Sequence, residues 1–154
     1  MRRTEADKQF FQIMGEIVVL YSYSEVLCSL IVNHITNSLN GNKIFSNVKF
    51  NSDQKIQGYE SAVVKSKHEC KTRFLSALSD LNQCRLDRNT IVHTSWHSAR
   101  EEWHGFGIKK SDGKLTYSTT TDAKGLLKRL TILHGDILLI FSDTILADQK
   151  KNTL

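Results

Sequence analysis

The sequence predicts a mainly α-helical fold, a bundle of four to five helices with a small β-hairpin inserted before the last helix. Three observations support this class. The 154 residues contain no proline, so the strongest helix breaker is absent. Long segments near both ends carry apolar residues every three to four positions, the spacing of one helix face. Between them, Ser111-Asp112-Gly113 is a turn signal typical of a hairpin. The length fits a single domain, residues 1–154.

The first predicted helix covers about residues 4–39. Thr4 can cap its start together with Asp7, and Asn40-Gly41 supplies a stop signal. One apolar stripe consists of Phe10, Met14, Ile17, Tyr21, Leu27, Ile31 and Ile35, with Ser24 among them. A second set contains Phe11, Val18, Val19, Leu20, Val26 and Leu30. This width predicts burial on two sides, within a bundle or against a second subunit.

The middle of the chain reads as a loop followed by three helical segments. Residues 41–52 are rich in Asn and Ser and are predicted to be the loop. A second helix is expected to begin after a Ser52-Asp53 cap, with a third at about residues 69–85. A fourth, at about residues 86–100, follows with little or no break.

The hairpin and a final helix complete the predicted order. The hairpin covers about residues 102–119. Thr121 or Asp122 can cap the last helix. Its expected core stripe is Leu126, Leu130, Leu133, Ile137, Ile140, Phe141 and Ile145.

Composition and the N-terminus predict a protein of the cytoplasm. Arg2 and Arg3 are followed by charged residues rather than by the apolar core of a signal peptide. The most apolar stretch, residues 17–32, is short for a bilayer and contains polar side chains, so we expect a buried helix and no membrane contact. The three cysteines are odd in number and lack CxxC spacing, which predicts buried free thiols.

One short segment combines three groups that can act on a phosphodiester without a metal. Arg88 offers a fork of donors for phosphate oxygens, and His93 can exchange a proton near neutral pH. Asn89 can orient either partner, and it shares a helical face with His93 at i and i+4. Arg88 lies about 140° round the helix from His93 at roughly 100° per residue, so its long stem must reach across unless it stands where a helix begins.

Arg88, Asn89 and His93 resemble the signature of the HEPN domain family (higher eukaryotes and prokaryotes nucleotide-binding). That signature is an arginine, a polar residue that is often asparagine, and a histidine four to six residues further along. The predicted order of elements also resembles a HEPN bundle. The resemblance implies that the motif opens the penultimate helix.

The resemblance implies a metal-independent endoribonuclease that needs no cofactor. His93 would act as general acid or base, Arg88 would stabilise charge on the phosphoryl oxygens, and Asn89 would position either group or the phosphate. The implied products are a 2′,3′-cyclic phosphate and a 5′-hydroxyl. Family members dimerise so that two motifs face one composite cleft. RNA substrate, a homodimer and an antitoxin or regulatory protein are therefore the implied partners, as for a toxin or phage-defence effector.

Two positions after the motif need separate interpretation. Ser95 stands where the toxin branch paired with nucleotidyltransferase antitoxins has a tyrosine, so regulation through that tyrosine is not expected here. Trp96 follows it. Its ring can stack on a base, but a tryptophan in an apolar helix usually belongs to the core.

The excess of 21 Lys and Arg over 16 Asp and Glu, a net charge of +5, is compatible with an anionic partner. A face that follows phosphates is predicted from the basic stretch before the motif. Together with Trp96, the predicted RNA-binding residues are Lys65, Lys67, Lys71, Arg73 and Arg85. The alternative is an ordinary solvated helix face.

Two other hypotheses compete with the ribonuclease. His93, His97 and Glu101 repeat at i, i+4 and i+8, but a straight helix spreads them over about 12 Å, too far for one ion. No metal site is therefore predicted, and His93 and His97 are the ligands to test. The second alternative is a noncatalytic interaction or RNA-binding bundle, because a helical bundle does not by itself determine function.

Overall fold

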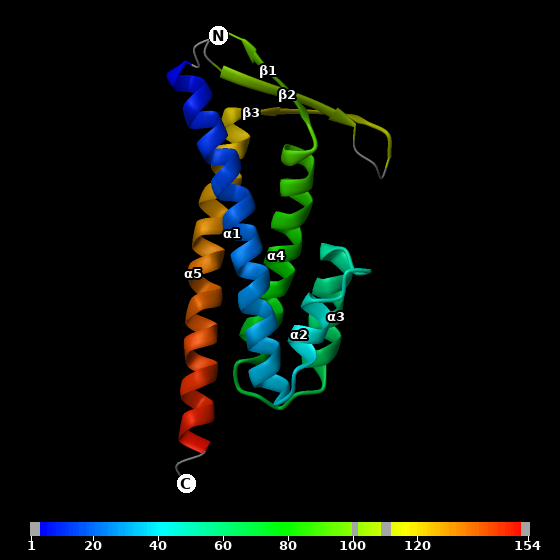
Figure 1. The fold of residues 1–154 in the computed structure, drawn as a ribbon, viewed down its shortest axis with the longest axis vertical. Coiled ribbons are helices and arrows are strands. Elements are labelled where there is room, and N and C mark those ends of the chain that lie inside the picture. Colours follow the sequence, from blue (N-terminus) through cyan, green and yellow to red (C-terminus); the bar gives the residue numbers. More distant parts are fainter. Residues whose placement is uncertain (1–3, 100–101, 109–111, 152–154) are drawn as a thin grey trace.

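The computed structural model describes residues 4–99, 102–108 and 112–151. The helices are α1 (Glu5–Thr36), α2 (Asn40–Phe45), α3 (Ser52–Val64), α4 (Lys71–Val92) and α5 (Thr120–Lys151). The strands are β1 (Ser95–Ala99), β2 (Glu102–Ile108) and β3 (Leu115–Thr119). Helices α1 and α5 run side by side in the same direction, and α4 runs back between them and α3 (Figure 1). The predicted mainly helical class is confirmed.

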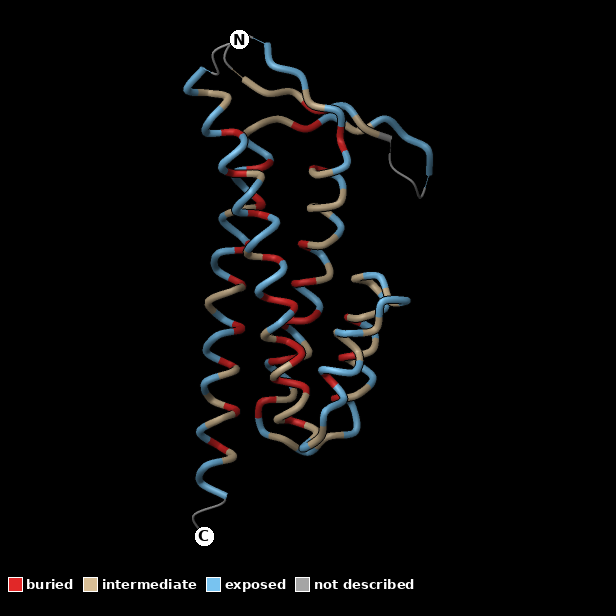
Figure 2. The backbone as a smooth tube through the Cα atoms, viewed as in Figure 1, coloured by how far each residue is buried: buried red, intermediate tan, exposed pale blue. Residues whose placement is uncertain are grey.

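The core lies where α1, α4 and α5 meet, with α3 covering the lower part (Figure 2). The predicted stripes of the first and last helices both point into this core. Ile17, Tyr21 and Ile31 of α1 are fully buried, as are Leu126 and Ile137 of α5. All three cysteines are buried and free, as predicted.

The start of α1 follows the sequence signal, while its end does not. The Thr4 hydroxyl accepts from the Asp7 amide and the Asp7 carboxylate accepts from the Thr4 amide, which is the expected capping box. The helix ends earlier than predicted, at Thr36, because Asn37 takes a left-handed conformation with φ 47°.

The prediction of a loop at residues 41–52 is partly wrong, because α2 occupies the beginning of this segment. This short helix packs so tightly on α1 that a Cβ at Gly41 would lie 1.8 Å from the Ser29 carbonyl oxygen. The next helix is capped by Asn51, whose side chain accepts from the Gln54 amide at 2.9 Å. The cap therefore stands one residue before the Ser52-Asp53 pair that was predicted. Local composition does not reveal α2, since its stabilising contacts come from α1 and α3.

The largest correction concerns the helices predicted at residues 69–85 and 86–100. They form one helix, α4, that ends at Val92, and the chain then enters β1. β-branched residues crowd this end, at Thr90, Ile91, Val92 and Thr94. The Trp96 indole also donates to the Ile91 carbonyl at 2.8 Å, which satisfies an exposed end of the helix.

The predicted hairpin is part of a three-stranded antiparallel sheet in the order β1-β2-β3. Residues 102–119 supply β2 and β3, and β1 comes from the segment that was predicted to be helical. One face of this sheet packs on the start of α1. There, Phe10 stacks on Trp103 with ring centroids 4.7 Å apart and also contacts Trp96 at 4.9 Å. The sheet therefore covers the end of the bundle (Figure 1).

The last helix, α5, is continuous, but its start differs from the predicted cap at Thr121 or Asp122. The Asp122 carboxylate accepts from the Thr119 amide at 2.7 Å, so Asp122 stands in the first turn and not at the cap position.

The second apolar set of α1 stays largely on the surface. Val18, Val19 and Val26 are exposed, as are Leu138 and Leu139 of α5. Both helices are long and apolar enough to cross a membrane by length and composition alone, a criterion that core helices also meet. The cytoplasmic location stays a prediction.

Candidate active site

The motif residues lie at the end of α4 that contacts the sheet. Arg88 and Asn89 stand in the last turns of the helix and His93 is its C-cap. The motif therefore closes the penultimate helix, whereas the resemblance implies that it opens that helix. The His93 amide donates to the Asn89 carbonyl at 3.2 Å, so these two residues remain one turn apart, as their spacing predicts.

The Arg88 guanidinium is held between an amide and an aromatic ring. Its Nε and Nη2 atoms both donate to Asn89 Oδ1, at 3.3 and 2.8 Å. Its central carbon lies 4.2 Å from the centroid of the Tyr21 ring of α1. The long stem therefore reaches sideways to α1, and the plane of the guanidinium is set before any ligand arrives.

Tyr21 belongs to a buried polar cluster beneath the arginine. Glu25 and Tyr59 lie beside it, and one Glu25 carboxylate oxygen and the Tyr59 hydroxyl have no hydrogen-bond partner among the described residues. Burial raises the pKa of the Tyr21 hydroxyl above its ordinary range, and the Glu25 carboxylate raises it further. Tyr21 is therefore neutral near pH 7 and offers Arg88 the face of its ring.

His93 has the opposite environment. Its side chain is exposed, and its imidazole makes no hydrogen bond or ion pair with any residue that the structure describes. A structural histidine is usually buried with both ring nitrogens satisfied. The exposed imidazole can instead exchange a proton with solvent or with a bound substrate.

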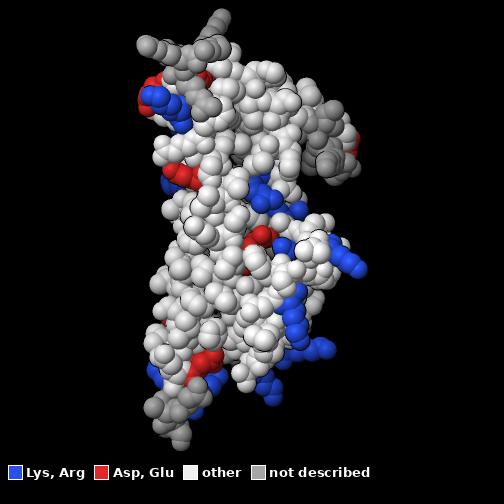
Figure 3. Space-filling model, in the orientation of Figure 1, with Lys and Arg blue, Asp and Glu red and all other residues white. Residues whose placement is uncertain are grey.

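Apart from Arg85, which stands three residues before Arg88, the predicted basic residues do not lie at this site. Lys65 and Lys67 lie in the connection between α3 and α4, with Lys71 at the first turn of α4. The 22 positions from Lys71 to His93 correspond to about 33 Å along the helix axis. Figure 3 shows that, in this view, one group of Lys and Arg side chains lies over α2 and α3.

Several of these residues have partners within the chain. The Arg85 guanidinium pairs with Asp53 at 2.8 Å and Arg73 pairs with Asp143 at 2.6 Å. Lys71 Nζ donates to the Val64 carbonyl. Trp96 packs on Phe10 and faces the helices, which is the core position favoured for a tryptophan.

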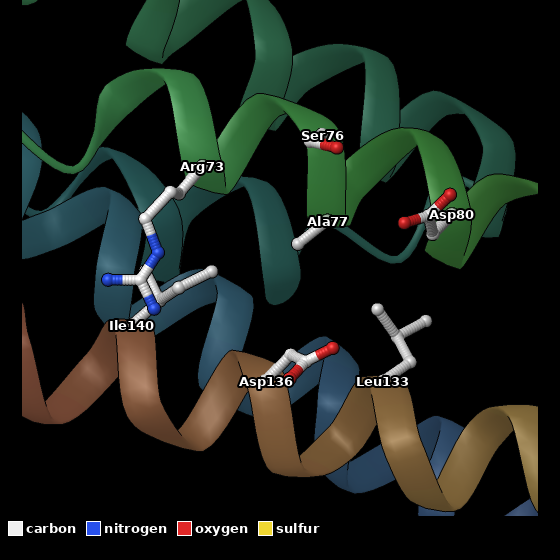
Figure 4. Close-up of a pocket in the computed structure, with 7 residues that line it drawn as sticks. All are labelled: Arg73, Ser76, Ala77, Asp80, Leu133, Asp136 and Ile140. Atoms are coloured by element: carbon white, nitrogen blue, oxygen red, sulfur yellow. The ribbon is translucent and has the colours of Figure 1, made fainter.

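Arg73 also lines a surface cavity of about 220 Å³ between α4 and α5 (Figure 4). Asp80 and Asp136 project toward this cavity from the two helices. Two carboxylates against one arginine make its lining unsuitable for an RNA phosphate.

No group of three metal-ligating side chains occurs among the described residues. His97 lies in β1, not one turn above His93 on a helix, so the predicted i, i+4 relation is lost. Glu101, the third residue of that pattern, lies outside the described residues.

Two features of the site could not be predicted from the sequence. Tyr21 was predicted only as a core residue, and the packing of α1 on α4 brings its ring under Arg88. The sheet beside His93 includes β1, which was predicted to be helical. No local signal marks either contact, because each joins segments distant in the chain.

Comparisons of the chain with protein-family profiles, with curated proteins and with solved structures found no match.

Proposed function

We propose that this protein is a metal-independent endoribonuclease of the HEPN type. The observation that carries the proposal is the exposed His93 imidazole one turn beyond an Arg88–Asn89 pair whose geometry is already set. A preorganised cation and a proton-exchanging group are two of the groups that catalyse transesterification of RNA.

In this proposal His93 takes the proton of the RNA 2′-hydroxyl. The 2′-oxygen then forms a bond to phosphorus, and the bond from phosphorus to the 5′-oxygen breaks. The leaving oxygen accepts a proton from an acid, so the products are a 2′,3′-cyclic phosphate and a 5′-hydroxyl. Arg88 stabilises the charge that develops on the phosphoryl oxygens, and Asn89 holds Arg88 in place.

The active unit is a homodimer in this proposal, because the reaction needs both a base and an acid and two subunits bring two His93 side chains. The apolar outer faces of α1 and α5 support it. Val19 is 47% exposed and Leu139 is 59% exposed, which is unusual for two long helices that are otherwise well packed.

The test is cleavage of a mixed RNA pool in EDTA by the wild-type protein. We expect His93→Ala to reduce the rate by about 10² to 10⁴-fold, the usual contribution of a general acid or base. Arg88→Ala should also lose activity, and end analysis should show cyclic phosphates. Ser79→Ala, at an exposed position of the same helix, is the control and should cleave like the wild type.

Undiminished cleavage by a folded His93→Ala protein would exclude the proposed mechanism. No cleavage by a folded, dimeric wild type would favour the second candidate, a noncatalytic module that binds RNA or a protein such as an antitoxin. The observation favouring that candidate is the same exposed apolar surface on α1 and α5, which can receive a partner of another kind.

A further inference from the structure

We infer that the outward face of the β-sheet is a stacking platform for the bases of single-stranded RNA. The inference deepens the proposed ribonuclease function and rests on it, since it identifies how the substrate is held. The carrying observation is a pair of neighbouring exposed rings, Phe106 and Tyr117, on a sheet whose first strand begins two residues after His93.

Strand register determines which side chains share this face. Ser95, Phe106 and Tyr117 are direct partners across the three strands and form one row. His97, His104 and Thr119 form the next row on the same face. The alternating residues, which include Trp96 and Trp103, face the helices and pack on Phe10.

The rings on the outward face contact one another and are accessible to solvent. Phe106 is 45% exposed and Tyr117 is 56% exposed. Their ring centroids are 5.2 Å apart, and the Tyr117 ring is stacked with His104, to which its hydroxyl is also hydrogen-bonded. Three neighbouring rings are thus supported by one another while their outer surfaces stay open to solvent.

The platform is attached firmly to the end of α4. Thr94, the residue after His93, packs beneath the sheet so closely that a Cβ at Gly105 would lie 2.4 Å from its methyl carbon. Only glycine leaves room for this contact. The sheet therefore keeps its position relative to the motif.

The distance from His93 to the rings suits a short strand of RNA. Ser95 follows His93 by two residues, at most about 7 Å of chain. Phe106 and Tyr117 lie one and two strands further, at about 4.8 Å per strand. The Cα atoms of both residues therefore lie within about 17 Å of the His93 Cα atom, so a short single strand of RNA can span these positions.

The chemistry of the face favours single-stranded nucleic acid as the occupant. Aromatic rings in adjacent strands of an open sheet stack on unpaired bases, whereas duplex RNA hides its base faces. Lys114, directly before β3, adds a positive charge at the edge of this sheet, which favours a polyanion.

The experiment measures binding of a labelled 2′-O-methyl RNA 12-mer, which lacks the hydroxyl needed for cleavage. We expect Phe106→Ala and Tyr117→Leu each to weaken binding on the order of tenfold, and Tyr117→Phe to bind like the wild type. Val48→Ala is the control, because Val48 is 97% exposed in the connection between α2 and α3, outside the sheet and outside the exposed faces of α1 and α5. The salt dependence of binding should not change, since a ring contributes no phosphate contact.

Equal binding by the ring variants and the wild type would overturn the inference, and so would a duplex of the same length that binds as tightly as the single strand. A change in oligomeric state with unchanged RNA binding would assign the face to protein contact instead. His93→Ala should bind the 12-mer normally. Binding through the rings without cleavage of ordinary RNA would refute the proposed function alone, and cleavage without ring-dependent binding would refute the platform alone.

Discussion

At the scale of single residues, the orientation of Arg88 is decided by the ring beneath it. The Tyr21 centroid lies 4.2 Å from the guanidinium carbon, and an interaction of this kind contributes roughly 0.5–2 kcal/mol. Tyr21 is therefore a positioning residue, since it acts on the substrate only through Arg88.

The corresponding prediction compares two substitutions of Tyr21. Tyr21→Phe keeps the ring, so its RNA cleavage rate should stay within about twofold of the wild type. Tyr21→Leu removes the ring, and we expect a loss of about two- to thirtyfold from a contact of that strength. The measurement is single-turnover cleavage, with circular dichroism as the check on folding. Equal rates for the two variants would show that the ring does not orient Arg88.

At the scale of secondary-structure elements, α2 depends on its close approach to α1. Gly41→Ala would place a methyl group 1.8 Å from the Ser29 carbonyl oxygen, so the backbones must separate. We expect a loss of about 1–3 kcal/mol in the free energy of unfolding, measured with urea. Gly135→Ala in α5 is the control. No atom lies within 4 Å of its added methyl group, and helix propensity predicts a gain of up to about 1 kcal/mol.

At the scale of the whole molecule, the surface of α1 and α5 predicts self-association. Ile132, Leu139 and Leu146 recur every seven residues on the face of α5 opposite its buried stripe, and each is more than half exposed. Light scattering should give a dimer for the wild type. Leu139→Glu should shift the protein toward monomer and lower its RNA cleavage, whereas Ser79→Glu on α4 should do neither. A wild type that is strictly monomeric would contradict a composite active site.

The buried thiols and phenols predict a further property of the whole fold, its loss of stability at high pH. Burial raises the pKa values of Cys28 and Tyr59 above their ordinary values of 9.0 and 10.0. The folded state holds these protons more tightly, so the stabilisation is present below about pH 9 and is lost as the unfolded chain deprotonates. The melting temperature should fall between pH 9 and 11, and less steeply in Tyr59→Phe. Parallel curves for the two proteins would exclude Tyr59 as a contributor.

Much of the fold was predictable because its signals are local. The capping box of Thr4 and the apolar stripes of α1 and α5 depend on spacing within one segment, and all three were predicted correctly. The helix predicted at residues 86–100 was wrong because β1 forms only where β2 pairs with it and Phe10 packs on its tryptophan. Strand formation depends more strongly on tertiary neighbours than helix formation does.

By itself, the sequence determined the helical class, the buried stripes and the one-turn relation between Asn89 and His93, since these follow from the periodicity of the backbone. Only the tertiary structure decided that Arg88 lies on Tyr21 and that His93 closes a helix beside an open sheet. The tertiary structure also decided that Arg73 and Arg85 are paired with carboxylates of other helices. These outcomes depend on packing between distant segments, and no residue carries a local signal for a neighbour that only folding supplies.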